Sequence, residues 1–382
     1  MTQGEQWLDI PGAPRETRDT KSAVSGSRLV EHVESQLTLI TGAPGWLGTR
    51  LVRILVDGLP DAPALARPAP RRIRCLVLPG IPVRVLSDIS PEIELVEGDI
   101  RAPESVRAFF RGAEGATVFH LCGIIHPRRI RELYEINVEG TRNVLEAAIA
   151  AGARRLIAIS SNSPAGCNPR HEHVFDEMAP YHPYMHYGKS KKLMEGILQN
   201  ACAASRMDTV ILRPCWFYGP DQPPRQTRFF TMIKEGKAPI VGGGQSRRSM
   251  SYVDNTCQAL LLAERAPGAR GRVYWVADRR PYTMNEIVDT VERLLEQEFG
   301  IPVAHKRMRL PGVASEVALV ADKLLQSLGV YQQELHVLSE MNKTIACSVA
   351  RAERELGYDP KIELEEGMRR SIRWCLEHGQ TI

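Results

Sequence analysis

The sequence lacks the cysteine and leader patterns that mark secreted proteins and metal sites. None of its eight cysteines forms a Cys-x-x-Cys pair, and several lie inside apolar runs, which is typical of reduced core cysteines. The first residues do not show the charged-then-apolar order of a secretory signal. We therefore expect a cytoplasmic protein without a metal site.

Long apolar runs are also missing. No stretch reaches the roughly 18 residues that a membrane span requires. The strongest candidate, Val313 to Leu328, contains Glu316, Asp322 and Lys323. We expect this segment to be a helix of a soluble domain, and we expect no membrane span.

An excess of one charge is absent as well. The chain has 49 basic and 45 acidic residues, and its basic residues are scattered apart from short pairs such as Arg71-Arg72 and Arg247-Arg248. Proteins that bind nucleic acids usually carry a basic stripe, so we expect no nucleic-acid partner. The 382 residues, 43% of them apolar, can form one large or two modest globular domains.

Residues 1–36 contain few large apolar side chains and several glycines and prolines. Such a composition cannot bury enough apolar surface to offset the entropy cost of ordering the chain. The sequence therefore predicts a flexible extension over residues 1–36.

Strand-like and helix-like patterns alternate over residues 37–217. The strand-like runs are Leu37 to Ile40, Ile73 to Leu78, Ile93 to Val96, Thr117 to Leu121, Leu156 to Ile159 and Thr209 to Leu212. Helical patterns lie between them, including Ser105 to Phe110, Leu133 to Ala151 and Gly188 to Ala204. This alternation predicts an α/β fold with a doubly wound parallel sheet and right-handed crossovers.

The pattern loosens over residues 218–382. A strand returns at Val273 to Val276, and helices are expected at Met284 to Glu298, Ser315 to Leu328 and Leu364 to Leu376. We expect a smaller, mixed α/β substrate-binding region, from which segments can return to the sheet. It would close over the strand ends, where ligands bind in such folds.

A glycine-rich stretch, Thr41-Gly42-Ala43-Pro44-Gly45-Trp46-Leu47-Gly48, joins the first strand to the first helix. Glycines permit a sharp turn, and free amides at a helix start favour a phosphate. The spacing is one residue longer than the usual dinucleotide fingerprint, and Pro44 offers no N–H. A plain strand-turn-helix connection is the alternative interpretation.

Two further groups could carry acid–base chemistry. Tyr187 and Lys191 are four residues apart on a predicted helix and share a face. An ammonium near a phenol favours the phenolate. The run Ser160-Ser161-Asn162-Ser163 ends a strand, where hydroxyls can bind a reacting oxygen. The alternatives are a solvated lysine beside a packing tyrosine, and turn-forming serines.

Together these motifs resemble the extended short-chain dehydrogenase/reductase family. The matching segments follow the family's order: Thr41-Gly42-x-x-Gly45-x-x-Gly48, Gly98-Asp99-Ile100, Val118 to Gly123, Asn137-Val138-x-Gly140-Thr141-x-Asn143, Ser160-Ser161, Tyr187-x-x-x-Lys191, Leu212-Arg213-Pro214, Tyr218-Gly219-Pro220, Tyr252-Val253-Asp254-Asn255, Glu355-Leu356-Gly357-Tyr358-x-Pro360 and Glu366 to Trp374. The resemblance implies a Rossmann domain over residues 37–217 and a substrate-binding region over residues 218–382.

The resemblance implies that Ser161, Tyr187 and Lys191 are catalytic. Tyr187 would exchange a proton with the substrate oxygen, Ser161 would hold that oxygen, and Lys191 would lower the pKa of Tyr187 and bind the nicotinamide ribose. Ser161 is preferred to Ser160 and Ser163 because it stands five residues before Gly166, as the family's hydroxyl does.

The resemblance also implies NAD or NADP as cofactor. The residues expected to bind it are Gly42, Gly45, Trp46, Leu47, Gly48, Asp99, Ile100, Leu121, Tyr187, Lys191 and Pro214. The second strand ends in Leu78-Pro79-Gly80, where the family often carries an acidic residue or an arginine, so the choice between NAD and NADP stays open. A homodimer is one arrangement that the resemblance leaves open.

The segment Tyr252-Val253-Asp254-Asn255 and its neighbours resemble the 3β-hydroxysteroid dehydrogenase branch, which implies oxidation or reduction of a bulky secondary alcohol or ketone. The alternative is a nucleotide-sugar epimerase, because Arg248 stands where many epimerases bind a diphosphate. A dehydratase is less favoured, since Asn162-Ser163 replaces that group's Asp-Glu. A non-catalytic cofactor sensor is disfavoured because Tyr187 and Lys191 are retained. After the fourth strand, His126-Pro127-Arg128-Arg129 departs from the family pattern, and we expect its arginines to face water.

Overall fold

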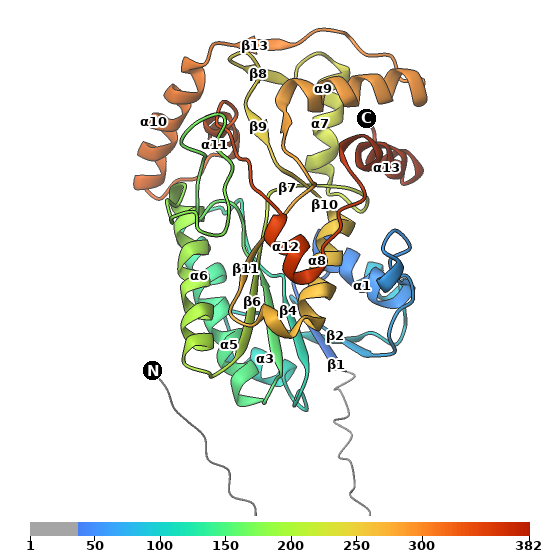
Figure 1. Cartoon of the computed structure of the whole chain (residues 1–382), viewed down its shortest axis with the longest axis vertical. Coiled ribbons are helices and arrows are strands. Elements are labelled where there is room, and N and C mark those ends of the chain that lie inside the picture. Colours follow the sequence, from blue (N-terminus) through green and yellow to red (C-terminus); the bar gives the residue numbers. More distant parts are fainter. Residues whose placement is uncertain (1–36) are drawn as a thin grey trace, which may run out of the picture. The chain divides into compact units, whose positions relative to one another are not determined.

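A seven-stranded sheet forms the centre of the computed structural model, which describes residues 37–382 (Figure 1). The prediction for residues 1–36 lies outside the described residues. Every strand pair in this sheet is parallel. In spatial order the strands are β11 (Val273–Val276), β6 (Asp208–Pro214), β5 (Arg155–Ile159), β4 (Thr117–His120), β1 (Leu37–Thr41), β2 (Arg72–Val77) and β3 (Glu94–Glu97). The predicted doubly wound α/β fold is confirmed.

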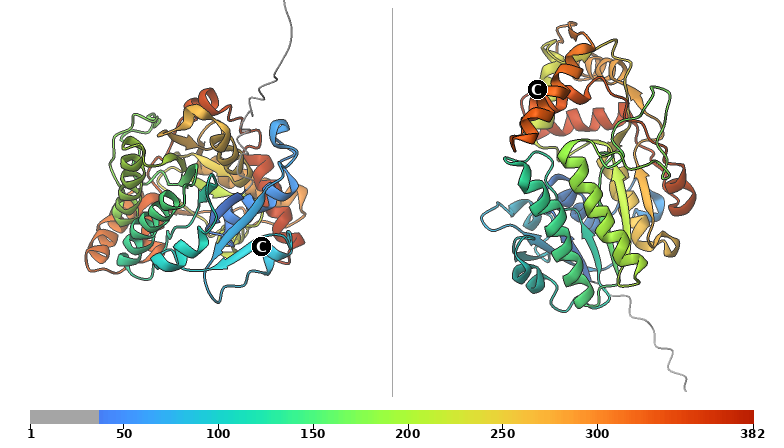
Figure 2. Two further views of the ribbon diagram at one scale, coloured as in Figure 1. Left: turned by 90° about the horizontal axis from the view of Figure 1, so that it is seen from below. Right: turned by 90° about the vertical axis from the view of Figure 1, so that its left-hand side faces the viewer.

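Helices cover both faces of the sheet, so its strands are apolar on both sides. Leu39 packs against the layer of α3, α5 and α6, and its neighbour Ile40 packs against the layer of α1 and α8. The layer helices are α1 (Trp46–Asp57), α3 (Pro103–Phe109), α4 (Ile130–Tyr134), α5 (Thr141–Ala150), α6 (Met185–Ala203), α8 (Val253–Arg265) and α12 (Ala350–Leu356). A π-helical segment, Glu135–Gly140, joins α4 to α5. Figure 2 shows the two layers from the side and from below.

The order of the strands reverses between β1 and β4. At such a switch point the loops that follow the two strands diverge and leave room for a ligand at the carboxyl ends. The loops begin in contact here, because Leu121 N donates to Thr41 O at 3.0 Å. The glycine-rich stretch therefore leaves the sheet beside the segment that begins at Leu121.

The chain after residue 218 returns to the sheet through α8, β11 and α12, and most of the rest gathers above the carboxyl ends of the strands (Figure 1). A separate apolar core forms there between α7 (Pro224–Lys234), α9 (Met284–Arg293) and α13 (Leu364–Glu377). Short paired strands complete this part: β7 (Trp216–Tyr218), β8 (Pro239–Val241), β9 (Arg247–Arg248), β10 (Met250–Tyr252), β12 (Tyr282–Thr283) and β13 (Met308–Leu310). The sequence did not predict them, because two or three residues are too few to show a period.

Two helices, α10 (Val313–Ser327) and α11 (Gln333–Glu340), pack on each other and form what we call the α10–α11 hairpin, residues 313–340. The helix α10 matches the predicted one. Its buried side carries Ser315, Asp322 and Gln326. Within residues 37–382 no helix combines the length and the apolar character that crossing a bilayer demands.

Candidate active site

The first turn of α6 presents Tyr187 at the carboxyl edge of the sheet. The helix begins at Met185, which has a φ of +52°, a conformation that costs a non-glycine residue about 1–2 kcal/mol. Gly188 then allows the helix to approach the serine loop, because a Cβ at Gly188 would lie 2.5 Å from Ser163 O. The glycine of the Tyr-x-x-x-Lys motif thus explains how Tyr187 reaches the serines.

Ser161 is the serine that meets Tyr187. The Ser161 hydroxyl lies close enough to the Tyr187 phenol to act on its pKa, and it donates to Ser163 Oγ at 3.3 Å. Ser160 Oγ is buried and has no hydrogen-bond partner among residues 37–382. The alternation of side chains along the strand separates the two neighbours, so the structure brings together Ser161 and Tyr187 and leaves Ser160 apart.

Lys191 lies one turn below Tyr187 and is buried. Its Nζ donates to Ile159 O at 2.9 Å, and a Cβ at Gly123 would stand 3.3 Å from it. Asn137 holds the surroundings in place: its side chain bonds both Ile124 N, at 2.8 Å, and Ser190 Oγ, at 3.1 Å. Asn137 belongs to a motif that the sequence showed, but this positioning role was missed, because it depends on contacts across two loops.

Burial shifts the pKa values of the catalytic pair in opposite directions. It raises the pKa of Tyr187 to about 12, where the Ser161 hydroxyl acts to lower it and the charge of Glu340 to raise it. Burial also lowers the pKa of Lys191 to about 8. Besides burial, the groups that act on the pKa of Tyr187 here are Ser161 and Glu340, and the lowering by Lys191 stays a prediction. At neutral pH Tyr187 is a protonated phenol.

The glycine loop fits a pyrophosphate. Gly42 has a φ of +92°, and a Cβ there would lie 2.6 Å from Cys122 N, so the loop packs directly on the chain after β4. Helix α1 has no side-chain cap at Gly45 and no acidic residue in its first turn. The first N–H groups of a helix have no intrahelical acceptor, so those of Trp46, Leu47 and Gly48 suit an anion.

The other predicted cofactor residues lie along the same edge. Asp99 and Ile100 follow β3, Leu121 follows β4, and Pro214 ends β6. The Asp99 carboxylate accepts from Arg101 Nε at 2.9 Å, and this bond keeps the pKa of Asp99 below its usual value. Asn143 Nδ2 donates to Ile100 O at 2.8 Å and fixes this loop to α5.

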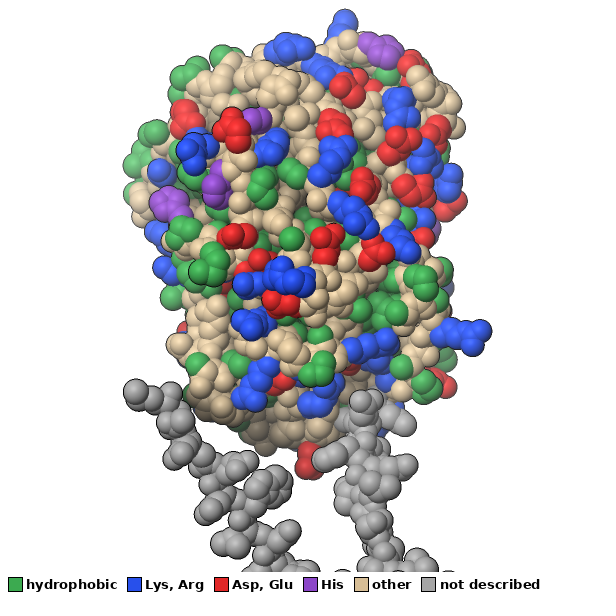
Figure 3. Space-filling view, viewed as in Figure 1, with side chains coloured by type: hydrophobic (Ala, Val, Ile, Leu, Met, Phe, Trp, Pro, Cys, Tyr) green, Lys and Arg blue, Asp and Glu red, His purple; other side chains and the backbone are tan. Residues whose placement is uncertain are grey.

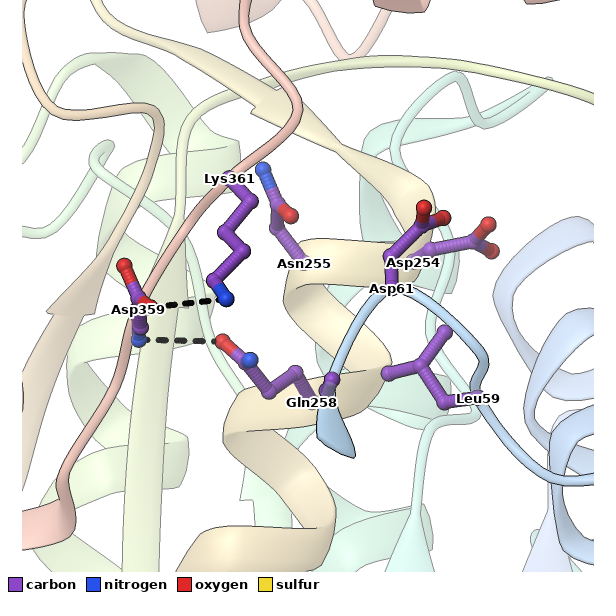
Figure 4. A pocket seen from close by; sticks show the side chains of 8 residues that line it. Leu59, Asp61, Asp254, Asn255, Gln258, Asp359 and Lys361 are labelled. Carbon is purple, nitrogen blue, oxygen red and sulfur yellow. Dashed lines mark hydrogen bonds and ion pairs between the residues drawn. The ribbon is translucent and has the colours of Figure 1, made fainter. Parts of the chain in front are cut away.

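Helix α1 is tied to the later part of the chain beside the glycine loop. Trp46 Nε1 donates to Pro220 O at 2.6 Å, and Arg50 forms a two-bond ion pair with Asp254, with Nη2 at 2.9 Å from Oδ2. Through these contacts the segments 218–220 and 252–255 hold the start of helix α1 in place. Beside Asp254 lies a crevice of about 10 Å³ (Figure 4), which is too small for a substrate.

The α10–α11 hairpin forms the wall that faces Tyr187. Tyr331, between the two helices, accepts or donates a hydrogen bond of 2.7 Å with His126 Nδ1. Tyr184 Oη lies 2.7 Å from Ser339 Oγ on α11. Burial, together with the charges of Arg225 and His336, lowers the pKa of His126 to about 4, so His126 is neutral at pH 7. Arg128 and Arg129 are exposed, as expected.

Sequence reasoning did not assign His126, Tyr331 or Tyr184 to this wall. The irregular His126-Pro127-Arg128-Arg129 segment was the available signal, but it did not tell which side chain turns inward. Arg248, the residue expected for an epimerase, is buried, and its guanidinium bonds the carbonyl of Glu340 at the end of α11. Among residues 37–382, no group of three or more His, Cys, Asp or Glu side chains could hold a metal ion.

The model of the family described as the NAD dependent epimerase/dehydratase family matches residues 38–277. An uncharacterised protein of Sinorhizobium fredii, y4nL, is 49% identical over 91% of this chain and 98% of its own length. The Arabidopsis thaliana 3beta-hydroxysteroid-dehydrogenase/decarboxylase isoform 1 is 28% identical, with 87% of this chain and 78% of that protein covered.

A third relative is the N-acetyl-alpha-D-glucosaminyl-diphospho-ditrans,octacis-undecaprenol 4-epimerase of Escherichia coli O157:H7, 30% identical over 70% of this chain and 74% of that enzyme. Among solved structures, the UDP-glucose 4-epimerase of Thermotoga maritima has the same fold, with a TM-score of 0.70, 21% identity and coverage of 90% of this chain and 100% of that one. The family match confirms the predicted resemblance and the predicted cofactor, NAD or NADP. The chain belongs to the NAD-dependent epimerase/dehydratase family of extended short-chain dehydrogenase/reductase enzymes.

Proposed function

We propose that this enzyme interconverts a secondary alcohol and a ketone on a bulky, amphipathic substrate, with Tyr187 as the general acid/base. The observation that supports the proposal is the placement of Ser161 next to the buried Tyr187, together with the buried Lys191, whose Nζ donates to Ile159 O at 2.9 Å. Two neighbouring hydroxyls can both be directed at one substrate oxygen.

In the direction of ketone reduction, the protonated Tyr187 donates its proton to the carbonyl oxygen while Ser161 holds that oxygen. The bound nicotinamide supplies the hydride. The raised pKa keeps Tyr187 protonated at neutral pH, so the proton needed for ketone reduction is present, while little phenolate is available to take a proton from an alcohol. We therefore expect ketone reduction to proceed at neutral pH, and alcohol oxidation to become faster as the pH rises towards the pKa of Tyr187.

The character of the facing wall supports the substrate class. Tyr184, Tyr331 and a neutral His126 supply rings whose polar tips are already paired, with Ser339 or with each other, and such side chains suit an amphipathic substrate. The similarity to the Arabidopsis thaliana 3beta-hydroxysteroid-dehydrogenase/decarboxylase supports the same class.

The second candidate is a nucleotide-sugar or polyprenyl-diphospho-sugar epimerase, in line with the Escherichia coli relative. One observation favours it: Arg248 Nε is buried and has no acceptor among residues 37–382, so a phosphate oxygen would satisfy it. Against it stands the bond of the same guanidinium to Glu340 O, which gives Arg248 a structural role at α11.

The test incubates the enzyme with NAD⁺ or NADP⁺ and a panel of hydroxysteroids, other bulky secondary alcohols and UDP- or dTDP-sugars. Absorbance of the reduced nicotinamide and the configuration of the sugars are measured together. Reduced cofactor formed in proportion to ketone supports the dehydrogenase, whereas sugar interconversion without net reduction would establish the epimerase.

In the same assay we expect Tyr187→Phe to bind cofactor normally and to lose turnover by ~10² or more, the effect of a missing general acid/base. Tyr134→Phe is a matched control, since Tyr134 bonds His186 outside the catalytic set at 2.7 Å. Wild-type turnover by Tyr187→Phe would refute the assignment.

A further inference from the structure

Helix α10 has polar side chains on its buried side and large apolar side chains on its exposed side. Its buried side holds Ser315 and Asp322, both 0% exposed. Its exposed side carries an apolar row, with the charged Glu316 and Lys323 also exposed next to it. The residues of this row form a stripe, which we call the α10 stripe: Val313, Val317, Val320, Leu324 and Leu328, each between 63% and 71% exposed.

The orientation of the helix is fixed by its polar side. Asp322 Oδ2 lies 2.7 Å from His336 Nδ1 on α11, and Gln326 Nε2 donates to Asp322 at 2.9 Å. Turning α10 over would bury the valines and leave these groups without partners, at the cost of several buried hydrogen bonds. The α10 stripe is therefore held outward by a specific network.

The stripe stands free at the margin of the molecule. Helix α10 forms the upper left edge of the ribbon in Figure 1, and Figure 3 shows hydrophobic side chains along the same margin. Its residues recur at intervals of three and four, so they share one face over about 22 Å of helix. Contiguous apolar faces of this kind mark sites of interaction.

Cations without ion pairs lie at one end of the stripe. Arg129 pairs through its backbone with Val330, two residues after Leu328. The side chains of Arg128 and Arg129 are exposed and have no carboxylate partner within residues 37–382, and the same holds for Lys323 on α10. Two acids also lie at this end, Glu334 on α11 and Glu132, whose carboxylate accepts from Arg128 N at 2.9 Å, against the three cations Arg128, Arg129 and Lys323. The local charge is therefore positive.

The chemistry of this surface fits an anionic lipid surface better than a second copy of the chain. The stripe has five residues, whereas a stable protein interface has about 20–30 residues on each side. A row of apolar side chains with flanking cations is what an interfacial helix needs to bind anionic membranes.

We propose that the α10 stripe docks this enzyme on the surface of an anionic membrane. The helix lies along the interface with its apolar residues in the acyl boundary, and Lys323, Arg128 and Arg129 contact the headgroups. This docking does not depend on the proposed function.

The end of the stripe has a consequence for catalysis, and this consequence does rest on the proposed function. Val330 is followed by Tyr331, which bonds His126 in the wall that faces Tyr187. A docked enzyme therefore has its catalytic wall next to the lipid interface, where a bulky amphipathic alcohol or ketone partitions.

The experiment sediments the full chain with vesicles of phosphatidylglycerol and phosphatidylcholine, and with vesicles of phosphatidylcholine alone. The test variant is Val317→Ser/Val320→Ser/Leu324→Ser. The matched control is Leu78→Ser/Ile81→Ser/Val85→Ser, three residues that are 37–43% exposed after β2. We expect the wild type and the control to bind the anionic vesicles with similar affinity, and the affinity of the test variant to be lower by about tenfold or more.

Three further measurements make the result decisive. Arg128→Gln/Arg129→Gln should weaken binding to anionic vesicles and leave the weaker binding to phosphatidylcholine unchanged. The melting temperature and cofactor binding of the test variant should match the wild type, because the changed residues are exposed. Turnover on a detergent-dispersed substrate reports the proposed function separately.

Absence of wild-type binding to anionic vesicles would overturn the proposal, as would equal binding by the test variant. Light scattering gives the remaining outcome. If the wild type is an oligomer that the test variant takes apart, the stripe is an interface between copies and the membrane proposal is wrong.

Discussion

The central sheet and the α10–α11 hairpin bury opposite kinds of side chain. In the sheet, Leu39, Val118 and Ile157 are 0% exposed between helix layers. In the hairpin, Ser315 and Asp322 take the buried positions and valines face outward. Burial of apolar surface explains the sequence of the sheet, whereas the apolar residues of α10 contribute little to folding. Their placement therefore needs a reason outside the stability of the hairpin.

The two regions also differ in the interactions that stabilise them, and therefore in their expected free energy of opening. Each large apolar side chain in the sheet contributes about 1.5–3 kcal/mol on burial, while a buried hydrogen bond contributes only about 0.5–1.5 kcal/mol net. The hairpin, which depends on such bonds, should open more easily than the sheet. Since the hairpin forms the wall opposite Tyr187, its opening would expose the catalytic edge while the sheet stays intact.

The largest expected effect tests the rigid region. Gly42→Ala places a Cβ 2.6 Å from Cys122 N, where backbone must move, so we expect cofactor affinity to fall by about 100-fold or more. Gly112→Ala is the matched control, because Gly112 also has a positive φ but no atom lies within 4 Å of its Cβ position. Fluorescence titration with NAD⁺ or NADP⁺ measures both. Equal affinities would show that the loop does not need its close contact with β4.

A smaller effect is expected in the hairpin. Asp322→Asn turns an amide donor towards Gln326 and removes the charge beside His336, which should destabilise the hairpin by about 1–3 kcal/mol. Amide hydrogen exchange should accelerate over residues 313–340 and stay unchanged in β1, β4 and β5. Glu316→Gln on the same helix is the control, because its pair with Lys343 is exposed and contributes less than about 1 kcal/mol.

The pH dependence of this variant sharpens the test. Burial acts to lower the pKa of His336. The hydrogen bond to Asp322 and the charges of Glu340 and Asp322 together outweigh burial, so the pKa of His336 is raised above 6.5. The stabilisation by this pair is fully present below the ordinary pKa of 6.5 and is lost as the pH rises through the raised value. Asp322→Asn should therefore cost most in mildly acidic buffer. A cost that is independent of pH would contradict the ion-pair interpretation.

The sequence predicted the sheet well, because its strands and helices carry strong local periods. The predicted strand Val273 to Val276 matches β11 residue for residue. The predicted helix from Ser315 to Leu328 also exists as α10, but its period cannot tell which side faces inward. The network of Asp322 with His336, which lies on another helix, determines that side.

In the candidate site, too, the sequence located some residues and missed others. The motif order located Ser161, Tyr187 and Lys191 because each stands at a strand end or helix start. The wall residues Tyr331 and His126 are 205 positions apart in sequence, and only their hydrogen bond shows that they meet. The Tyr187 pKa was missed for a related reason: burial depends on neighbours that a local motif does not name.

The smallest expected effect concerns the rigid region again, where burying the charge of Lys191 has a cost in stability. Burial lowers the pKa of Lys191 from 10.5 to about 8, so the folded protein carries a penalty for protonated Lys191 below pH 8. This penalty decreases as the pH rises from about 8 to 10.5.

The variant Lys191→Met fills similar space without the charge, but it loses the hydrogen bond to Ile159 O. We therefore expect the variant to melt at a slightly higher temperature than the wild type at neutral pH, and to lose this difference near pH 10. Scanning calorimetry of both proteins across this range measures the difference, with the exposed Lys192→Met as the control. A variant that melts below the wild type at every pH would mean that the Ile159 bond outweighs the cost of burying the charge.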